Sequence, residues 1–419
     1  MAATSNVLYT YYVSRLGAEA IAVVSLVFPV VLLAITAMGG GIGAGASSAV
    51  ARALGAGDRE QAAWVAEHAL LLAAAIGIGF ALAVQVGAHG LFALMGGRGA
   101  VLERATQFAK ILFGGAIIQF TGAMFDSILR AEGNVRIASI WSAVAIGLQI
   151  VLTPFFMFIV GLELPGAAVA MLVSQALATI PRAYWVLGGK GTVHPRLRIS
   201  RLSLAPLKDI LRVGIPASLA TVITYTGTMV LTGVVARFGD AHLAAYGLGT
   251  RLDFLLLSFV FGVGASVLTL VGMTTGAGRP QRASLYVNAA IAMVMIMLAP
   301  PALVLAWKPA LWLHIFTQEP DIEAVGSMYF RIIGPSYPFL GVAMVVSFAF
   351  QGLGRATAPL AWVILRVVGV LGAAIVCTRW LGMDEHAVFA AVAIGNVLSA
   401  GVMTAMFRRL SPKATVSSI

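Results

Sequence analysis

Apolar stretches long enough to cross a lipid bilayer recur along almost the whole chain, and short polar breaks separate them. A helix needs about 20 apolar residues to cross a hydrocarbon core about 30 Å thick. Only 10% of the 419 residues are charged and 60% are hydrophobic, which leaves too little polar surface for a water-soluble fold of this length. The sequence therefore predicts an integral membrane protein that crosses the bilayer many times.

The stretches are predicted to be helices because they are long and rich in Ala, Leu and Met. The strands of a membrane barrel would be about ten residues long and would alternate in polarity. We expect eleven complete spans, near residues 20–48, 64–94, 107–129, 137–161, 166–188, 213–237, 242–273, 285–307, 327–350, 358–379 and 387–407. A further apolar piece, Ser5 to Val13, is too short to cross and is interpreted as the tail of another helix.

Lysine and arginine residues concentrate in alternate loops, which indicates that these loops are cytoplasmic. The predicted cytoplasmic loops are 50–62, 130–136, 189–212, 274–284 and 351–357, together with the C-terminus. This distribution accounts for the net charge of +11 without a nucleic-acid partner. We expect a monomeric, multi-pass protein of the plasma membrane (the inner membrane of a bacterium), surrounded by lipid, with its C-terminus in the cytoplasm.

Two halves of the chain are related in sequence. The matched segments are RLGAEAIA at 15–22 with RFGDAHLA at 237–244, GAGDREQA at 55–62 with GAGRPQRA at 276–283, and ILRAEGN at 128–134 with FQGLGRA at 350–356. Polar loops repeated at a constant offset are specific evidence of an internal repeat. The repeat predicts an N-terminal lobe at 1–188, a cytoplasmic connector at 189–212 and a C-terminal lobe at 213–419.

Equivalent segments of the two halves have the same orientation, so each half must contain an even number of helices. The second half has six spans and the first half has five complete ones. We therefore expect that about 30 residues of a first helix are missing at the N-terminus, through a truncated gene or a misplaced start. A genuine eleven-helix protein is the alternative.

Glycines crowd the first complete span, at positions Gly39, Gly40, Gly41, Gly43 and Gly45. Small residues allow either close packing between helices or a bend in one of them. A pair of related bundles with such helices is a recurrent transporter architecture, in which a central cavity opens to each side in turn.

The repeat motifs resemble those of the multidrug and toxic compound extrusion (MATE) family. YYVSRLGAEAIAVVSLVFP followed by ARALGAGDREQA is similar to the opening of that family, and VGIPASLATVI followed by ARFGDAHLAAYGLGTRLD is similar to the start of its C-terminal lobe. The resemblance covers the chain except for the first helix. It implies a twelve-helix, V-shaped antiporter of two six-helix bundles that exports organic, often cationic, compounds against an inward proton or sodium gradient.

The chain departs from this family at the positions where many members carry coupling acids. Tyr9 stands at the end of the first helix, Thr153 precedes Pro154, and Thr224 occupies the position of a glutamate in the seventh helix. We therefore assign no coupling role to Tyr9, Thr153 or Thr224.

Asp253 is the best remaining candidate for a coupling-ion or substrate site, because it lies near the middle of a span, where an ionisable residue is costly. The alternative to this functional role is a structural ion pair of Asp253 with Arg366 or with Arg251. Asp126 is the second candidate, although Arg130 follows it by four residues, and a local ion pair is the simpler account.

Tyr225 and Gln175 are polar residues at depth that would line a cavity or form hydrogen bonds between helices. Nothing resembles an enzyme site: HExxH, GxSxG and Walker motifs are absent, and the single cysteine, Cys377, excludes a disulfide framework. We expect no metal and no cofactor beyond the transported coupling ion, H⁺ or Na⁺.

These observations predict a secondary active antiporter that exports a small organic substrate. Two alternatives remain open. One is a flippase for lipids or lipid-linked saccharides, of the same superfamily as the MATE proteins. The other is an inactive, truncated transporter.

Overall fold

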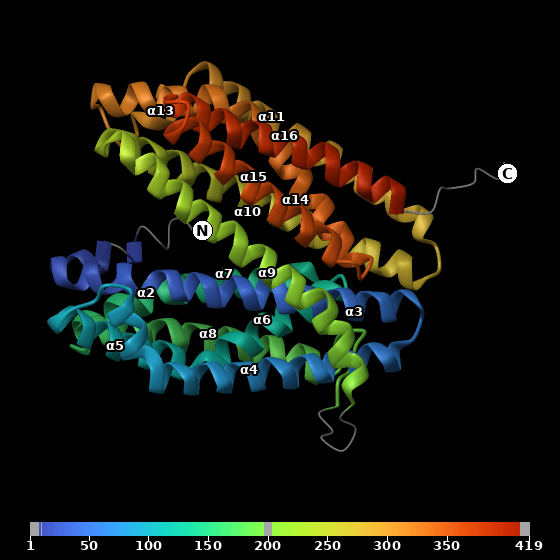
Figure 1. Ribbon diagram of the computed structural model, residues 1–419. Coiled ribbons are helices and arrows are strands. Elements are labelled where there is room, and N and C mark those ends of the chain that lie inside the picture. Colours follow the sequence, from blue (N-terminus) through green and yellow to red (C-terminus); the bar gives the residue numbers. More distant parts are fainter. Residues whose placement is uncertain (1–7, 10, 197–202, 411–419) are drawn as a thin grey trace. The chain divides into compact units, whose positions relative to one another are not determined.

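The computed structural model describes residues 8, 9, 11–196 and 203–410, and within these residues the chain forms helices and no strand (Figure 1). Ten helices are long and apolar enough to cross a membrane, and α5 (Gly99–Gly114) with α6 (Ala116–Ala131) makes an eleventh span bent by 46°. The predicted all-α membrane fold is thereby confirmed. Of the piece predicted as a helix tail, Ser5 to Val13, the structure describes residues 8, 9 and 11–13, and the rest lies outside the described residues.

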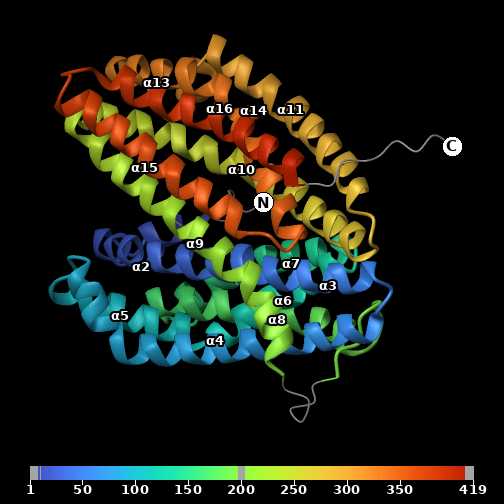
Figure 2. The same cartoon turned by 45° about the vertical axis from the view of Figure 1, so that its right-hand side comes forward.

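The chain divides into two compact units, of which the first contains residues 1–54 and 58–214. Its elements up to the connector are α2 (Ala18–Thr36), the π-helix η1 (Ala37–Ile42), α3 (Gly43–Gly55), α4 (Arg59–Leu94), α5, α6, α7 (Val135–Pro154), the π-helix η2 (Phe155–Ile159) and α8 (Glu163–Leu187). Helix α6 packs against both α4 and α8, and α8 packs against α7 (Figure 2).

The glycine-rich span of unit 1 contains a change of helix type and a close approach to another stretch of main chain. The backbone changes to a π-helix at Ala37–Ile42, where three of the glycines lie, and returns to an α-helix at Gly43. One turn further on, a Cβ atom on Gly45 would overlap the carbonyl oxygen of Ile210. Only glycine therefore lets α3 approach the main chain near residue 210 so closely.

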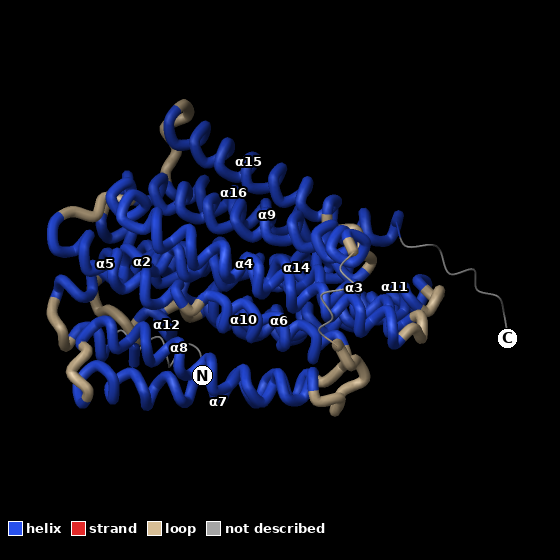
Figure 3. Tube along the Cα trace, turned by 90° about the horizontal axis from the view of Figure 1, so that it is seen from below, coloured by secondary structure: helices blue, strands red, loops and turns tan. Residues whose placement is uncertain are grey.

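The second unit contains residues 215–419 and the short segment 55–57. Its elements after α9 are η4 (Ala236–Phe238), α10 (Asp240–Gly276), η5 (Pro280–Arg282), α11 (Ala283–Trp307), α12 (Ala310–Leu313), α13 (Pro320–Ile333), η6 (Gly334–Ser336), α14 (Tyr337–Gly352), α15 (Thr357–Arg379) and α16 (Glu385–Leu410). Helix α14 is central, because it packs against α10, α11 and α16. Loops lie at the helix ends (Figure 3).

The boundary between the units falls inside one helix, α9 (Leu204–Val235), between Gly214 and Ile215. Helix α9 thus begins within the segment 189–212 that the sequence predicts to be a connector, part of which (197–202) lies outside the described residues. Its first turns are held to unit 1. Arg52 donates to both carboxylate oxygens of Asp209, at 2.7 and 2.8 Å, and the main-chain N–H of Ser203 donates to His68 Nε2 at 3.0 Å.

Candidate functional site

Asp253 lies in the first half of α10 and directs its carboxyl group into the core of unit 2. Tyr329 of α13 donates a hydrogen bond to Asp253 Oδ2 at 3.1 Å. The hydroxyl of Tyr337 lies close to the same carboxyl group but forms no hydrogen bond of normal geometry with a described residue. Asp253 Oδ1 is likewise covered and has no partner in the described part of the chain. Asp253 Oδ1 therefore accepts no hydrogen bond of normal geometry, although the Tyr337 hydroxyl lies near the carboxyl group.

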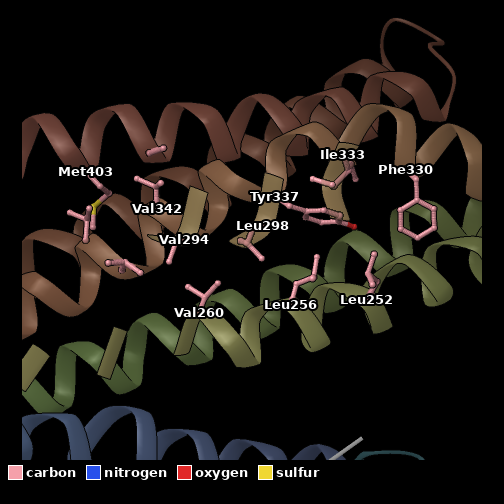
Figure 4. Close-up of a cluster of buried hydrophobic side chains, with 14 of the residues drawn as sticks. Leu252, Leu256, Val260, Val294, Leu298, Phe330, Ile333, Tyr337, Val342 and Met403 are labelled. Atoms are coloured by element: carbon pink, nitrogen blue, oxygen red, sulfur yellow. The ribbon is translucent and has the colours of Figure 1, made fainter. Parts of the chain in front are cut away.

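Aromatic and aliphatic side chains enclose this carboxyl group. Tyr246 and Tyr329 meet edge to face at 5.9 Å, and Tyr329 meets Phe389 at 5.3 Å. Figure 4 shows the ring of Tyr337 pointing toward the part of α10 that carries Leu252 and Leu256. The site combines one acid with phenol hydroxyls in an otherwise apolar core, where an uncompensated charge is costly.

Glycine at position 249, one turn before Asp253, makes room for Tyr329. A Cβ atom on Gly249 would overlap the Tyr329 ring. We expect Gly249→Ala to displace the ring and to lower the free energy of unfolding by about 1–3 kcal/mol, the usual cost of overpacking. Gly247→Ala is the matched control, because nothing lies within 4 Å of its added Cβ. Thermal unfolding of the two purified variants checks this, and equal melting temperatures would contradict it.

Tyr225 lies on α9, and its ring stacks on Phe254 with centroids 6.2 Å apart and planes 19° apart. Phe254 follows Asp253 directly and is 47% exposed. Unit 2 therefore presents an aromatic pair next to the position of its buried acid.

The ion pair with Arg366 or Arg251, which was the alternative role for Asp253, does not form. Arg366 Nη2 donates instead to Asn396 Oδ1 at 2.5 Å, and Asn396 Nδ2 donates to Ser336 Oγ at 2.9 Å. This chain of hydrogen bonds ties α15 and α16 to η6. The Arg251 guanidinium lies over the ring of Phe316, 5.7 Å from its centroid.

Asp126 of α6 forms a buried cluster in unit 1. Arg130 Nη2 lies 3.8 Å from Asp126 Oδ2, as the spacing of four residues allows. A closer partner, Arg182 of α8, places Nε 3.2 Å from Asp126 Oδ1 with its side chain only 3% exposed. Ser142 of α7 donates to Asp126 Oδ2 at 3.3 Å and accepts from Arg182 Nη2 at 3.4 Å. The cluster joins three helices, which is a structural arrangement.

Sequence reasoning missed Arg182. Its signal was an arginine inside a predicted span, directly after Pro181. Gln175 lies two turns earlier on α8, half-buried. The four predicted coupling or substrate residues thus fall in two groups, with Asp126 and Gln175 in unit 1 and Asp253 and Tyr225 in unit 2.

The threonines that stand in place of family acids bond to their own helices. Thr153 Oγ1 donates to the carbonyl of Gln149 at 2.6 Å, and Thr224 Oγ1 donates to that of Ala220 at 2.8 Å. Among the described residues, no group of three or more His, Cys, Asp or Glu side chains is placed to hold a metal ion.

Two units of membrane-spanning helices, each with a buried acid, define a multi-pass helical transporter as the class of protein. A family model, MatE, matches residues 1–155 and 216–378, which is most of the chain. The chain belongs to the MATE family, whose members are transporters rather than enzymes. The family resemblance of the sequence motifs is confirmed.

Individual relatives and solved structures are similar to this chain over most of its length. A FAD transporter of Shewanella oneidensis is 26% identical over 364 residues, which cover 86% of this chain and 80% of that protein. The multidrug export protein MepA of Staphylococcus aureus is 23% identical over 353 residues, covering 84% and 77%. A crystal structure of MATE in the bent conformation superposes with a TM-score of 0.91 at 29% identity, covering 97% of this chain and 90% of that one.

Proposed function

We propose that the chain is a monomeric antiporter of the plasma membrane that exports amphipathic organic cations from the cytoplasm in exchange for protons. Asp253, with its uncommitted Oδ1 in the core of unit 2, is the observation that carries this proposal. The positive charges of alternate loops support a cytoplasmic C-terminus.

A proton suits the surroundings of Asp253 better than sodium. Sodium sites in transporters use main-chain carbonyls released where a helix is unwound. Helix α10 runs from Asp240 to Gly276 without a break, so its carbonyls stay engaged in the helix. Tyr329 and Tyr337 supply hydroxyl oxygens, and a phenol can bond to either the charged or the neutral form of the carboxyl group.

The stacked pair of Tyr225 and Phe254 supports a flat cationic substrate. Aromatic faces attract cations through their ring quadrupoles, and they offer apolar area of no fixed shape. A cation attracted there would favour the charged form of Asp253. Binding of a proton to Asp253 would favour release of the cation. This competition couples the two movements.

Lipid-linked phosphates fit less well, because the deep arginine of unit 2, Arg366, is already engaged by Asn396. A second candidate substrate is a flavin dinucleotide, favoured by the relative described as a FAD transporter. Its flat isoalloxazine ring would use the same aromatic pair, but its two phosphates need cationic partners.

Transport by the purified protein in liposomes tests the proposal. An imposed pH gradient, with the membrane potential clamped, should speed the movement of ethidium, a flat fluorescent cation, at least about tenfold, equivalent to about 1.4 kcal/mol of barrier. A sodium gradient alone should have no effect. Acceleration by sodium at equal pH would refute proton coupling, and movement of FAD without movement of the cation would establish the second candidate instead.

A further inference from the structure

An open pocket of about 480 Å³ lies on the face of unit 1 that α4 and α5 form. Its polar lining consists of Gln85 and His89 from α4, and Glu103, Thr106, Gln107 and Lys110 from α5. None of these residues belongs to the Asp126 cluster. The proposed exchange at Asp253 uses none of them either.

In the part of α4 after Leu70, the polar residues lie at this pocket. Between Leu70 and Leu94, Gln85 and His89 are the two side chains that are not apolar, and their spacing of four residues puts both on one face. Both are exposed, as are neighbouring apolar residues such as Val86 at 88%. An exposed apolar surface of this kind on a membrane span contacts lipid, where an exposed polar side chain is costly unless a ligand satisfies it.

The charged residues of the pocket lack protein partners. Among the described residues, neither Glu103 nor Lys110 has an oppositely charged group within 4.0 Å. The neighbouring Arg104 points elsewhere and lies 3.4 Å from Glu19. Gln85 Nε2 donates to the main-chain oxygen of Lys110 at 2.9 Å, which joins α4 to α5 at the inner end of the pocket.

The order of the charges along α5 matches a lipid headgroup. Helix α5 begins at Gly99, next to the loop, so Glu103 lies nearer the membrane surface and Lys110 lies deeper. Seven residues separate them by about 10 Å of helix rise. In a zwitterionic phospholipid the phosphate is the deeper group and the ammonium the outer one, and a phosphoethanolamine group with a hydrogen bond at each end spans about this length.

We propose that this pocket binds the headgroup of a phospholipid with a primary ammonium, such as phosphatidylethanolamine. Lys110 holds the phosphate, its stem lying along the apolar surface, and Glu103 accepts hydrogen bonds from the ammonium. Gln85, Gln107 and His89 offer further hydrogen-bonding groups for the phosphate and ester oxygens. The lipid belongs to the leaflet on the side of the α4–α5 loop.

Lipid binding to the purified full-length protein in detergent, measured by native mass spectrometry, tests this assignment. Phosphatidylethanolamine should bind about tenfold more tightly than phosphatidylcholine, whose methylated ammonium donates no N–H bond, and than phosphatidylglycerol, which has no ammonium. Lipids with a mono- or dimethylated ethanolamine headgroup should bind with affinities between those of phosphatidylethanolamine and phosphatidylcholine. Equal affinity for the ethanolamine and choline lipids would overturn the proposal, whatever the variants do.

Two variants locate the site. Glu103→Gln should lower the affinity for phosphatidylethanolamine to that for phosphatidylcholine. Lys110→Gln should lower the affinity for all the phospholipids about tenfold. Glu163→Gln and Lys308→Gln, at exposed positions that do not line the pocket, are matched controls that should change neither affinity. An undiminished ethanolamine preference in Glu103→Gln would refute the site. Soluble phosphoethanolamine binding as tightly as the lipid would refute a lipid ligand.

Discussion

Asp253→Asn is expected to abolish proton-driven export while leaving the protein folded. The amide has the shape of the carboxyl group and can still accept the hydrogen bond from Tyr329, but it neither binds nor releases a proton. The rate of cation movement under a pH gradient should fall at least about 100-fold, which corresponds to about 2.7 kcal/mol of barrier. Initial rates in liposomes, at matched protein density, measure this.

Asp240→Asn is the matched control for Asp253→Asn. Asp240 is the first residue of the same helix and is exposed, so its replacement should leave the rate within about twofold. Transport by Asp253→Asn at the rate of the control, with the pH gradient still required, would place the coupling group elsewhere and leave Asp253 a structural role.

Arg182→Met is expected to be the most destabilising change in unit 1. It removes the nearer cationic partner of Asp126 and leaves the buried carboxylate with the more distant Arg130, at 3.8 Å. Breaking a buried ion pair from one side costs about 3–5 kcal/mol, because the remaining charge stays desolvated. The double variant Arg182→Met with Asp126→Asn should recover much of this loss, which a double-mutant cycle from thermal or denaturant unfolding would measure.

Arg104→Met tests the same chemistry at an exposed ion pair. Arg104 and Glu19 are 48% and 39% exposed, and such pairs contribute at most about 1 kcal/mol. If Arg182→Met unfolds at the same temperature as Arg104→Met, the cluster around Asp126 is not the buried structural unit inferred here.

The spans were predictable because hydropathy is a local property of the chain. A window of about 20 residues is enough to detect a span, and the eleven expected spans match those that the structure describes. The bend at Gly115, between α5 and α6, was not predictable in this way. Apolar residues continue on both sides of the bend, and hydropathy carries no information on the direction of the backbone.

The side-chain partners were harder to predict than the spans. Asp253 and Arg366 both lie inside spans, which left an ion pair open as an alternative, but position along a helix carries no information on which way each side chain points. The structure directs Asp253 toward the tyrosines of α13 and α14, and Arg366 toward Asn396 of α16. Arg182 was overlooked for a related reason, since an arginine near a span end ordinarily extends to the membrane surface. Its partners lie on α6 and α7, far away in the sequence.

The position of the unit boundary inside α9 has a consequence for the ancestry of the molecule. If the repeat arose by duplication of one gene segment, the two copies were once interchangeable. They no longer are, because the helix that leads into the second copy, α9, is held at its first turns by the first copy, through Arg52 and Asp209. A chimera joined at the start of α9 would separate these residues, whereas one joined at Gly214 would keep them together. About three turns of this helix, from Leu204 to Gly214, must therefore be inherited with the first half.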